Sequence, residues 1–279
     1  MTLDYLAIGH LTIDRTPWGP AAGGSVAYAA RTAASLGMKC GIITAADESL
    51  DWNSYLTGVE IVRHPANVTT KFENVYQGGK RIQRLLATSG KIPVTSVPPE
   101  WIGSTIVHLA PVVHEITGEF SELFPRSLVG ITPQGLLRDW DPSGLVYQSH
   151  WKGDDSLLSR SQIAIFSKDD ISNDPTFLCR CLEQIPIVVV TEGERGAILY
   201  HQGKCSRFPA YPAQEVDPTG AGDVFAASFL VEYHLTGDPH RSAAFACCAA
   251  SFAVERAGLE GITSRDAIED RLAQYRSLL

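Results

Sequence analysis

The stretch DPTGAGDVFAASFL, residues 217–230, decides how this sequence is interpreted. Pro218 fixes its own φ angle and favours extended geometry at Asp217, so a helix cannot run through this point. Thr219 can accept a hydrogen bond from the first turn of a helix that begins here. The apolar residues that follow, as far as Leu230, suit the body of such a helix. The stretch therefore predicts a glycine-rich turn that leads directly into a helix.

The same turn has the features of an anion site. Gly220, Ala221 and Gly222 carry almost no side chain, so a ligand can approach their backbone N–H groups closely. Unpaired N–H groups and the positive end of the helix dipole favour an anion there. Asp223 stabilises the first turn, yet beside a phosphate its charge is repulsive unless it accepts a proton from an attacking hydroxyl. The residues alone leave two interpretations open: a phosphate site, or an ordinary turn with a helix-stabilising aspartate.

Length and charge narrow the class of protein. The chain has 279 residues, 44% of them hydrophobic, which fits one large α/β domain with a sizeable core. A net charge of −8 argues against a nucleic-acid or anionic-membrane surface. We find no apolar run of transmembrane length, no leader pattern and no C-x-x-C pair among the six cysteines. We therefore expect a soluble, reduced, cytoplasmic protein.

Short apolar segments recur along the chain and predict buried strands. They alternate with helical patterns, which favours an α/β fold with a mostly parallel sheet. Two further strands, 68–76 and 80–87, mix polar and apolar residues and flank a glycine pair, which predicts a hairpin. No linker or repeat divides the chain, so we expect a single domain over residues 1–279. The predicted core strands are 3–9, 40–45, 104–110, 128–132, 162–166 and 186–191.

The segment DPTGAGDVFAASF, with its GAGD core, resembles the C-terminal signature of the PfkB/ribokinase family of carbohydrate and nucleoside kinases, usually D-T-x-G-A-G-D. The resemblance implies a ribokinase-like three-layer α/β/α sandwich with a small β-lid, here at about residues 66–90. It implies ATP as the phosphoryl donor with Mg²⁺. It also implies that Gly220, Ala221 and Gly222 form an anion hole and that Asp223 is the general base.

The N-terminal part carries a second resemblance, which concerns the acceptor. Gly23-Gly24-Ser25 opens a helical pattern and resembles the family's G-G signature, although the asparagine that usually follows is absent. Asp14 read alone is a solvated turn residue; in the family this position binds substrate hydroxyls, and a carboxylate can accept two of them. Only eight residues separate Asp14 from Gly23, where larger members carry a lid hairpin, so the resemblance implies a reduced lid.

Two further residues complete the predicted substrate contacts. Gln134 follows a predicted strand end, which is where ligands lie in open α/β sheets. Arg84 lies in the predicted lid hairpin and is a candidate to touch the substrate.

The nucleotide side rests on shorter motifs. Ser167 and Asp170 align with the Asn and Glu of the family's N-x-x-E pattern, so the resemblance implies that Asp170 reaches Mg²⁺ through water. The alternative is an aspartate-rich helix start stabilised by the dipole. The remaining implied nucleotide contacts are Thr191, Gly193 and Gly196 of a T-x-G-x-x-G loop, Thr219, and Cys247 in place of the family's asparagine in F-A-N.

These resemblances predict an ATP-dependent kinase that phosphorylates a hydroxyl of a small sugar or polyol. Residues 131–144, ITPQGLLRDWDPSG, resemble a branch related to plant myo-inositol kinase, so myo-inositol or a similar cyclic polyol is the leading acceptor. A nucleoside kinase is the alternative. A catalytically silent ligand sensor is a third hypothesis, because Ser167 and Cys247 depart from the family pattern. The expected partner is a small molecule, with no nucleic acid and no membrane, and the protein is expected to be a monomer or a homodimer.

Overall fold

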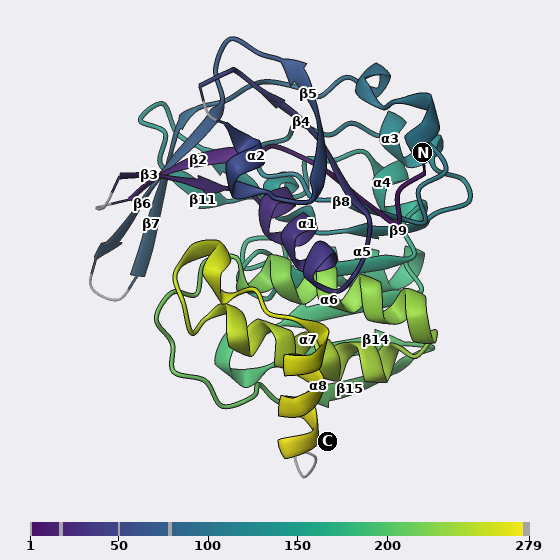
Figure 1. The fold of residues 1–279 in the computed structure, drawn as a ribbon. Coiled ribbons are helices and arrows are strands. Elements are labelled where there is room, and N and C mark those ends of the chain that lie inside the picture. Colours follow the sequence, from purple (N-terminus) through teal and green to yellow (C-terminus); the bar gives the residue numbers. More distant parts are fainter. Residues whose placement is uncertain (1, 17–18, 50, 78–79, 276–279) are drawn as a thin grey trace.

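The computed structural model describes residues 2–16, 19–49, 51–77 and 80–275. Within these ranges a nine-stranded sheet has the order β15-β14-β13-β12-β9-β8-β1-β4-β5 (Figure 1). The strands from β13 to β5 in that order run parallel, whereas β14 and β15 are antiparallel at one edge. The bounds are β1 Tyr5–Ile8, β4 Cys40–Ala46, β5 Val59–Pro65, β8 Ile106–Leu109, β9 Leu128–Ile131, β12 Ile163–Ser167, β13 Ile187–Thr191, β14 Ala197–His201 and β15 Lys204–Phe208.

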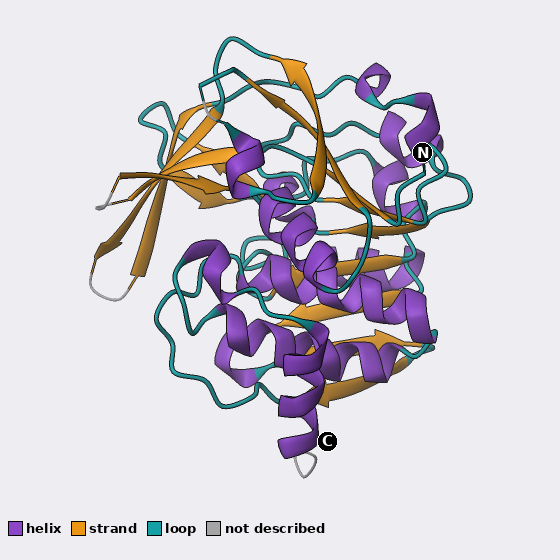
Figure 2. Cartoon of the chain, in the orientation of Figure 1, coloured by secondary structure: helices purple, strands orange, loops and turns teal. Residues whose placement is uncertain are grey.

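Helices cover both faces of this sheet, as Figure 2 shows, and the alternation of the strands explains why. Tyr5 and Ala7 of β1 pack into one hydrophobic cluster, whereas Leu6 and Ile8 pack into the other. Both clusters are apolar, so each needs a layer of helices. The predicted three-layer α/β/α sandwich is confirmed. The helices are α1 Ser25–Ser35, α2 Trp52–Tyr55, α3 Glu119–Leu123, α4 Asp155–Ser159, α5 Phe177–Gln184, α6 Ala221–Thr236, α7 Pro239–Ala253 and α8 Arg265–Gln274.

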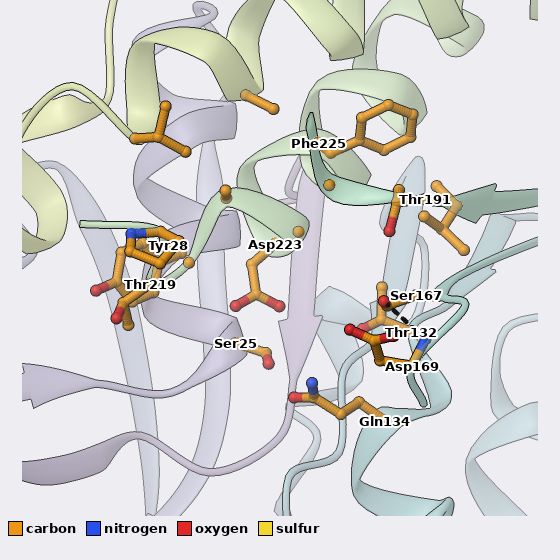
Figure 3. A pocket seen from close by; sticks show the side chains of 18 of the residues that line it. Ser25, Tyr28, Thr132, Gln134, Ser167, Asp169, Thr191, Thr219, Asp223 and Phe225 are labelled. Atoms are coloured by element: carbon orange, nitrogen blue, oxygen red, sulfur yellow. Dashed lines mark hydrogen bonds between the residues drawn. The ribbon is translucent and has the colours of Figure 1, made fainter. Parts of the chain in front are cut away.

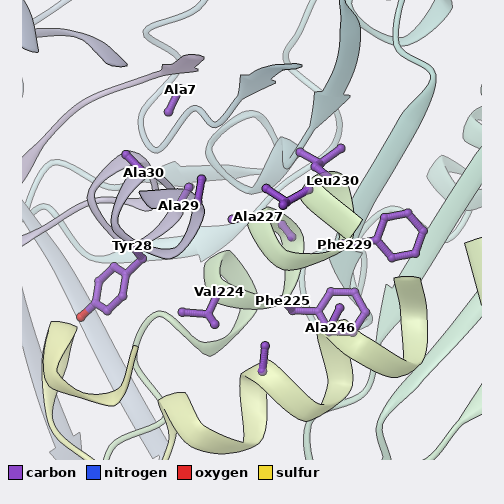
Figure 4. Packing of buried hydrophobic residues seen from close by; sticks show 14 of the residues in the cluster. Ala7, Tyr28, Ala29, Ala30, Val224, Phe225, Ala227, Phe229, Leu230 and Ala246 are labelled. Atoms are coloured by element: carbon purple, nitrogen blue, oxygen red, sulfur yellow. The ribbon is translucent and has the colours of Figure 1, made fainter. Parts of the chain in front are cut away.

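Helix α6 lies against α1 through small side chains. Ala29 and Ala30 of α1 and Ala227 of α6 are fully buried, and Figure 4 shows them in one cluster with Val224 and Phe225. Small residues let two helices approach closely, so the start of α6 is held at a fixed place over the sheet. None of the helices in the described ranges is both long enough and apolar enough to cross a bilayer.

The strand order reverses at β1. From β1 the chain proceeds to β4 and β5 on one side, and later to β8, β9 and β12 on the other. Loops that leave the carboxyl ends of strands on the two sides diverge at such a point, which creates a crevice for a ligand. The fold therefore predicts a site beyond the carboxyl ends of β1, β8 and β9.

A smaller four-stranded sheet, with the order β3-β2-β6-β7 in the described residues, projects from the main body. Its strands are β2 Thr12–Thr16, β3 Gly19–Gly23, β6 Thr70–Gln77 and β7 Lys80–Ala87. The hairpin of residues 70–87 was expected; the contribution of residues 12–23 was not. The prediction of a lid confined to about residues 66–90 is corrected here, because β2 pairs in parallel with β6 across a long sequence separation. Gly78 and Gly79 lie outside the described residues.

A small apolar cluster joins this sheet to the main body. Phe72 of β6 and Leu85 of β7 pack against Val112 and Val113, which follow β8. A separate two-stranded sheet, β10 Arg138–Trp140 with β11 Val146–Gln148, lies beside β7. The face of the small sheet that carries Phe72 is therefore held over the carboxyl edge of the main sheet.

Candidate active site

A cavity of about 730 Å³ opens at this edge, between the main sheet, the start of α6 and the small sheet. Its size is within the usual range for small-molecule sites. Most of the site residues expected from the sequence line it, namely Asp14, Gly24, Ser25, Gln134, Ser167, Asp170, Thr191, Gly193, Gly196, Thr219, Gly220, Ala221, Gly222, Asp223 and Cys247. The structure thus brings together residues more than 200 positions apart.

The turn before α6 differs from the expectation in one detail. The helix begins at Ala221, and Gly220 occupies the N-cap position with a φ of 80°, so Thr219 is not the cap. Asp217 fixes the turn instead: its Oδ1 accepts a hydrogen bond from the Thr219 N–H at 2.9 Å, and its Oδ2 accepts one from the Gly258 N–H at 3.2 Å. The turn therefore depends on a side chain that precedes it rather than on a capping hydroxyl.

Gly220 meets two constraints at once. Its positive φ is one that side chains rarely adopt, and a Cβ atom there would lie 2.2 Å from the ring of Tyr28. Tyr28 comes from α1, so the glycine allows the two helices to meet at the floor of the site. This is the physical reason for a glycine at the first position of the GAGD core.

Asp223 lies in the first turn of α6 and projects into the cavity. Figure 3 shows its carboxylate above Ser25, with Ser167, Thr132 and Asp169 across the cavity on the right. The N–H groups of the first helical turn favour negative charge at this place. The Asp223 carboxylate and the glycine-rich first turn of α6 therefore line one cavity.

Asp170 is held at the opposite wall, where β12 ends. The Ser167 N–H donates to Asp170 Oδ2 at 2.9 Å, and Gln134 Nε2 donates to Asp170 Oδ1 at 3.2 Å. Burial raises the pKa of Asp170, and the positive charge of Arg138 is the largest effect that opposes this rise. Asp170 is thus fixed in place by its neighbours. Among the residues that the structure describes, no group of three or more His, Cys, Asp and Glu side chains could hold a metal ion.

Asp14 and the glycine pair lie together on the acceptor side. Thr12 Oγ1 donates to Asp14 Oδ1 at 3.0 Å. Gly23 does not line the cavity; it pairs with Thr12 across β2 and β3, and a Cβ atom there would lie 2.8 Å from Asp14 Oδ2. Gly24, with a φ of 96°, has the His10 carbonyl oxygen where a Cβ atom would stand, at 2.3 Å. Gly23 and Gly24 therefore make room for Asp14 and for the backbone.

Arg84 is not part of the cavity lining. Its Nη1 donates to the Ser143 carbonyl oxygen at 3.4 Å, outside the cavity. Neighbouring residues of a strand point to opposite faces, and Gln83 lines the cavity instead, where its Oε1 accepts a hydrogen bond from Arg138 Nη1 at 2.8 Å. The sequence made Arg84 a candidate substrate contact, but it could not show which residues of β7 face the cavity, because the register of this strand was unknown.

In the apolar part of the cavity lining, sequence reasoning had assigned Cys247, as a nucleotide contact. We call this part of the lining the apolar lobe; it is formed by Tyr211, Ala213, Cys247, Ala250 and Val254. Burial raises the pKa of the Cys247 thiol to about 12, so it stays a neutral side chain. Other lining residues that had not been assigned include Thr12, Tyr28, Phe72, Val112, Thr132 and Asp169.

Comparison with known proteins gives a family model and a curated relative. Residues 160–265 match the model of the pfkB family carbohydrate kinases. A cytidine kinase from Thermococcus kodakarensis is 28% identical over 259 residues, which cover 83% of this chain and 88% of the relative.

Solved structures agree on the fold. A pyrophosphate-dependent kinase in the ribokinase family, complexed with a pyrophosphate analogue and myo-inositol, has a TM-score of 0.79 at 21% identity and covers 96% of this chain and 99% of its own. Arabidopsis thaliana ribokinase, complexed with ribose and ATP, has a TM-score of 0.75 at 20% identity and covers 98% of this chain and 99% of its own.

Proposed function

The chain belongs to the pfkB family of carbohydrate kinases, and we propose that it transfers the terminal phosphoryl group of ATP to a hydroxyl of myo-inositol or a similar cyclic polyol. The observation that carries this proposal is the position of Asp223. Its carboxylate shares one cavity with Asp14 and with the glycine-rich start of α6. A base, an acceptor contact and an anion site are the parts that the reaction needs.

In the proposed reaction the acceptor hydroxyl attacks the terminal phosphorus atom of ATP. Asp223 accepts the hydroxyl proton as the new O–P bond forms and the bond to ADP breaks. The backbone N–H groups of residues 220–222 stabilise the charge on the transferred group, because they are aligned before the reaction begins. Asp14 accepts hydrogen bonds from the acceptor hydroxyls and orients them.

Mg²⁺ fits the site as an ion that ATP brings with it. Magnesium in kinases keeps several waters and is bound by one or two carboxylates together with substrate phosphates. Both oxygens of Asp170 already accept a hydrogen bond, so this carboxylate would reach the ion through water, and Asp169 lines the same wall. When bound, the ion neutralises charge on the phosphates.

The apolar lobe beside Cys247 and Val254 favours ATP over pyrophosphate as the donor. An adenine ring needs apolar walls, whereas pyrophosphate has no group that would occupy them. The similar solved structures include two that are complexed with ATP and three of pyrophosphate-dependent kinases, so the donor is a point for direct measurement. We expect turnover with ATP and little or none with pyrophosphate.

Two alternatives follow from specific observations. The match to a cytidine kinase over 83% of this chain supports a nucleoside acceptor, which would use the same Asp14 and Gly24. Ser167 and Cys247, where the family pattern has asparagine, support a silent sensor. The presence of Asp223 argues against the sensor, because binding alone has no need of a base.

The first test is ADP release with Mg·ATP against a panel of polyols, hexoses, pentoses and nucleosides, with the Asp223→Asn protein in parallel. Release that depends on one acceptor and is lost in the variant supports the kinase and names the acceptor. Thermal stabilisation by the same compounds, without ADP release from the parent protein, favours the sensor. A response to nucleosides but not to polyols overturns the polyol proposal.

A further inference from the structure

A chain of hydrogen bonds crosses three strands beneath the candidate active site. Tyr5 lies on β1, His108 on β8, and Thr132 directly after β9. The Tyr5 hydroxyl lies 2.6 Å from His108 Nδ1, and His108 Nε2 lies 3.0 Å from Thr132 Oγ1. Tyr5 and His108 are fully buried, whereas Thr132 lines the cavity. A polar chain in an otherwise apolar core therefore ends at the site.

The protonation state of each group in this chain can be deduced. Burial lowers the pKa of His108 to about 3, so the ring is neutral and carries one N–H. Burial also raises the pKa of Tyr5 well above its ordinary value, with smaller contributions from Cys40 and Asp223, so the phenol keeps its proton. His108 Nδ1 is the partner that the structure gives the Tyr5 hydroxyl within the described residues. A buried phenol without another acceptor must donate there.

The direction of the remaining bonds follows from the first. If the Tyr5 O–H donates to Nδ1, this nitrogen is the acceptor and the proton of His108 is on Nε2. The Nε2–H then donates to Thr132 Oγ1. The hydrogen of the Thr132 hydroxyl is thus directed away from His108, toward the cavity. Figure 3 shows Thr132 on the wall with Ser167 and Asp169, across the cavity from Asp223.

We propose that Tyr5 and His108 are positioning residues, and that they hold the Thr132 hydroxyl as a hydrogen-bond donor to a phosphoryl oxygen of the bound ATP. This inference rests on the proposed function. A threonine hydroxyl can ordinarily donate or accept; here the buried pair leaves donation as its role toward the ligand. A donor that is oriented before the reaction stabilises developing charge better than one that must reorient.

The kinetic test distinguishes a positioning role of Tyr5 from a purely structural one. Thr132→Val keeps the shape and removes the hydroxyl, and we expect kcat to fall about 10²-fold. Thr132→Ser keeps the donor and should restore most of the activity. Tyr5→Phe removes one oxygen that does not reach the cavity, and we expect kcat to fall about 3–10-fold. Tyr233→Phe, the same change on α6 and outside this chain of bonds, should leave kcat unchanged.

The double variant Tyr5→Phe/Thr132→Val is the decisive member of the set. If Tyr5 acts through Thr132, its removal has no further effect on kcat once the hydroxyl is gone. Fully additive losses would show that Tyr5 acts on stability or on another group, and would overturn the proposal.

A second measurement does not depend on turnover. The ¹⁵N shifts of His108, assigned by comparison with a His108→Gln sample, should show the Nε2–H tautomer between about pH 5 and 8. Tyr5→Phe should shift the ring toward the other tautomer. A proton on Nδ1 in the parent protein would overturn the proposal outright.

The affinity for an ATP analogue tests the role of Thr132 independently of whether the protein is a kinase. The parent protein, Thr132→Val, Thr132→Ser and Tyr5→Phe are each titrated with the β,γ-imido analogue of ATP. Thr132→Val should weaken affinity about 3–10-fold, while Thr132→Ser should not. If no acceptor ever yields ADP, the proposed function fails but these titrations still test the donor role. Equal affinity in Thr132→Val and the parent overturns it.

Discussion

The two ends of the cavity are built in different ways. Most of the proposed phosphate end comes from two short, continuous stretches, residues 191–196 and 217–223, in which neighbours in sequence are neighbours in space. The proposed acceptor end comes from Asp14, Gln83 and Arg138, which belong to three separate elements of the two smaller sheets and are brought together by strand pairing and by the hydrogen bond between Arg138 and Gln83. The first end is mainly a local sequence motif, whereas the second forms only when strands distant in sequence come together.

This difference explains which property of the protein is easier to infer. A phosphate is bound mainly by backbone N–H groups, so the same short motif serves any member that transfers phosphate. The acceptor is recognised by side chains whose direction depends on strand register. The chemistry is therefore visible in a short segment, and the substrate is not.

The sharpest contrast is between Asp223 and Asp14, and we expect the larger effect on activity from Asp223. Asp223→Asn keeps the size of the side chain and removes the base, so we expect kcat to fall by about 10²–10⁴-fold with little change in KM. The measurement is steady-state ADP release with the acceptor found in the panel. An unchanged kcat would show that another group accepts the proton.

Gly220→Ala tests whether the local motif depends on its contact with α1. A Cβ atom there meets the Tyr28 ring at 2.2 Å and requires a strained φ, so the turn must shift. We expect at least a tenfold loss of kcat, because small displacements of aligned donors are costly. Gly58→Ala is the matched control: Gly58 has the same φ of 80° with open space around it. Equal losses in the two variants would show that backbone strain, and not the contact with Tyr28, is responsible.

Asp14→Asn tests the acceptor end. The neutral amide is a weaker acceptor for hydroxyls, and we expect KM for the acceptor to rise about 10-fold while kcat changes much less. The measurement is the dependence of the initial rate on acceptor concentration at saturating ATP. If kcat falls while KM for the acceptor stays unchanged, Asp14 belongs to the reacting centre, and the cavity does not have two separate ends.

The smallest effects are expected from adjacent residues of β7. Gln83→Ala removes the contact with Arg138 at 2.8 Å and should raise KM for the acceptor about 3–10-fold. Arg84→Ala removes a long contact with Ser143 outside the cavity, and its kinetics should stay within about twofold of the parent. The paired measurements use the same assay. The reverse result would support the original assignment of Arg84 to the substrate.

The sequence by itself determined the class of fold and the family, and it predicted the proposed phosphate end of the site. Apolar runs such as Ile187–Thr191 identify buried strands without further information, because a strand covered on both faces has no polar side. The GAGD core defines its own geometry within one turn of helix. Asp223, Thr191 and Gly196 could therefore be found from a few residues each.

Only the tertiary structure decided the rest. Pairing of β2 with β6 created the second sheet, the register of β7 turned Gln83 inward and Arg84 outward, and three core strands brought Tyr5 and His108 to Thr132. Each of these depends on contacts between residues far apart in the chain, and a shift of one residue in a strand reverses the direction of every side chain. Local sequence carries no record of that register. The proposed general base can thus be read from one segment, but the proposed acceptor contacts and the hydrogen bonds of Thr132 exist only once the sheets are formed.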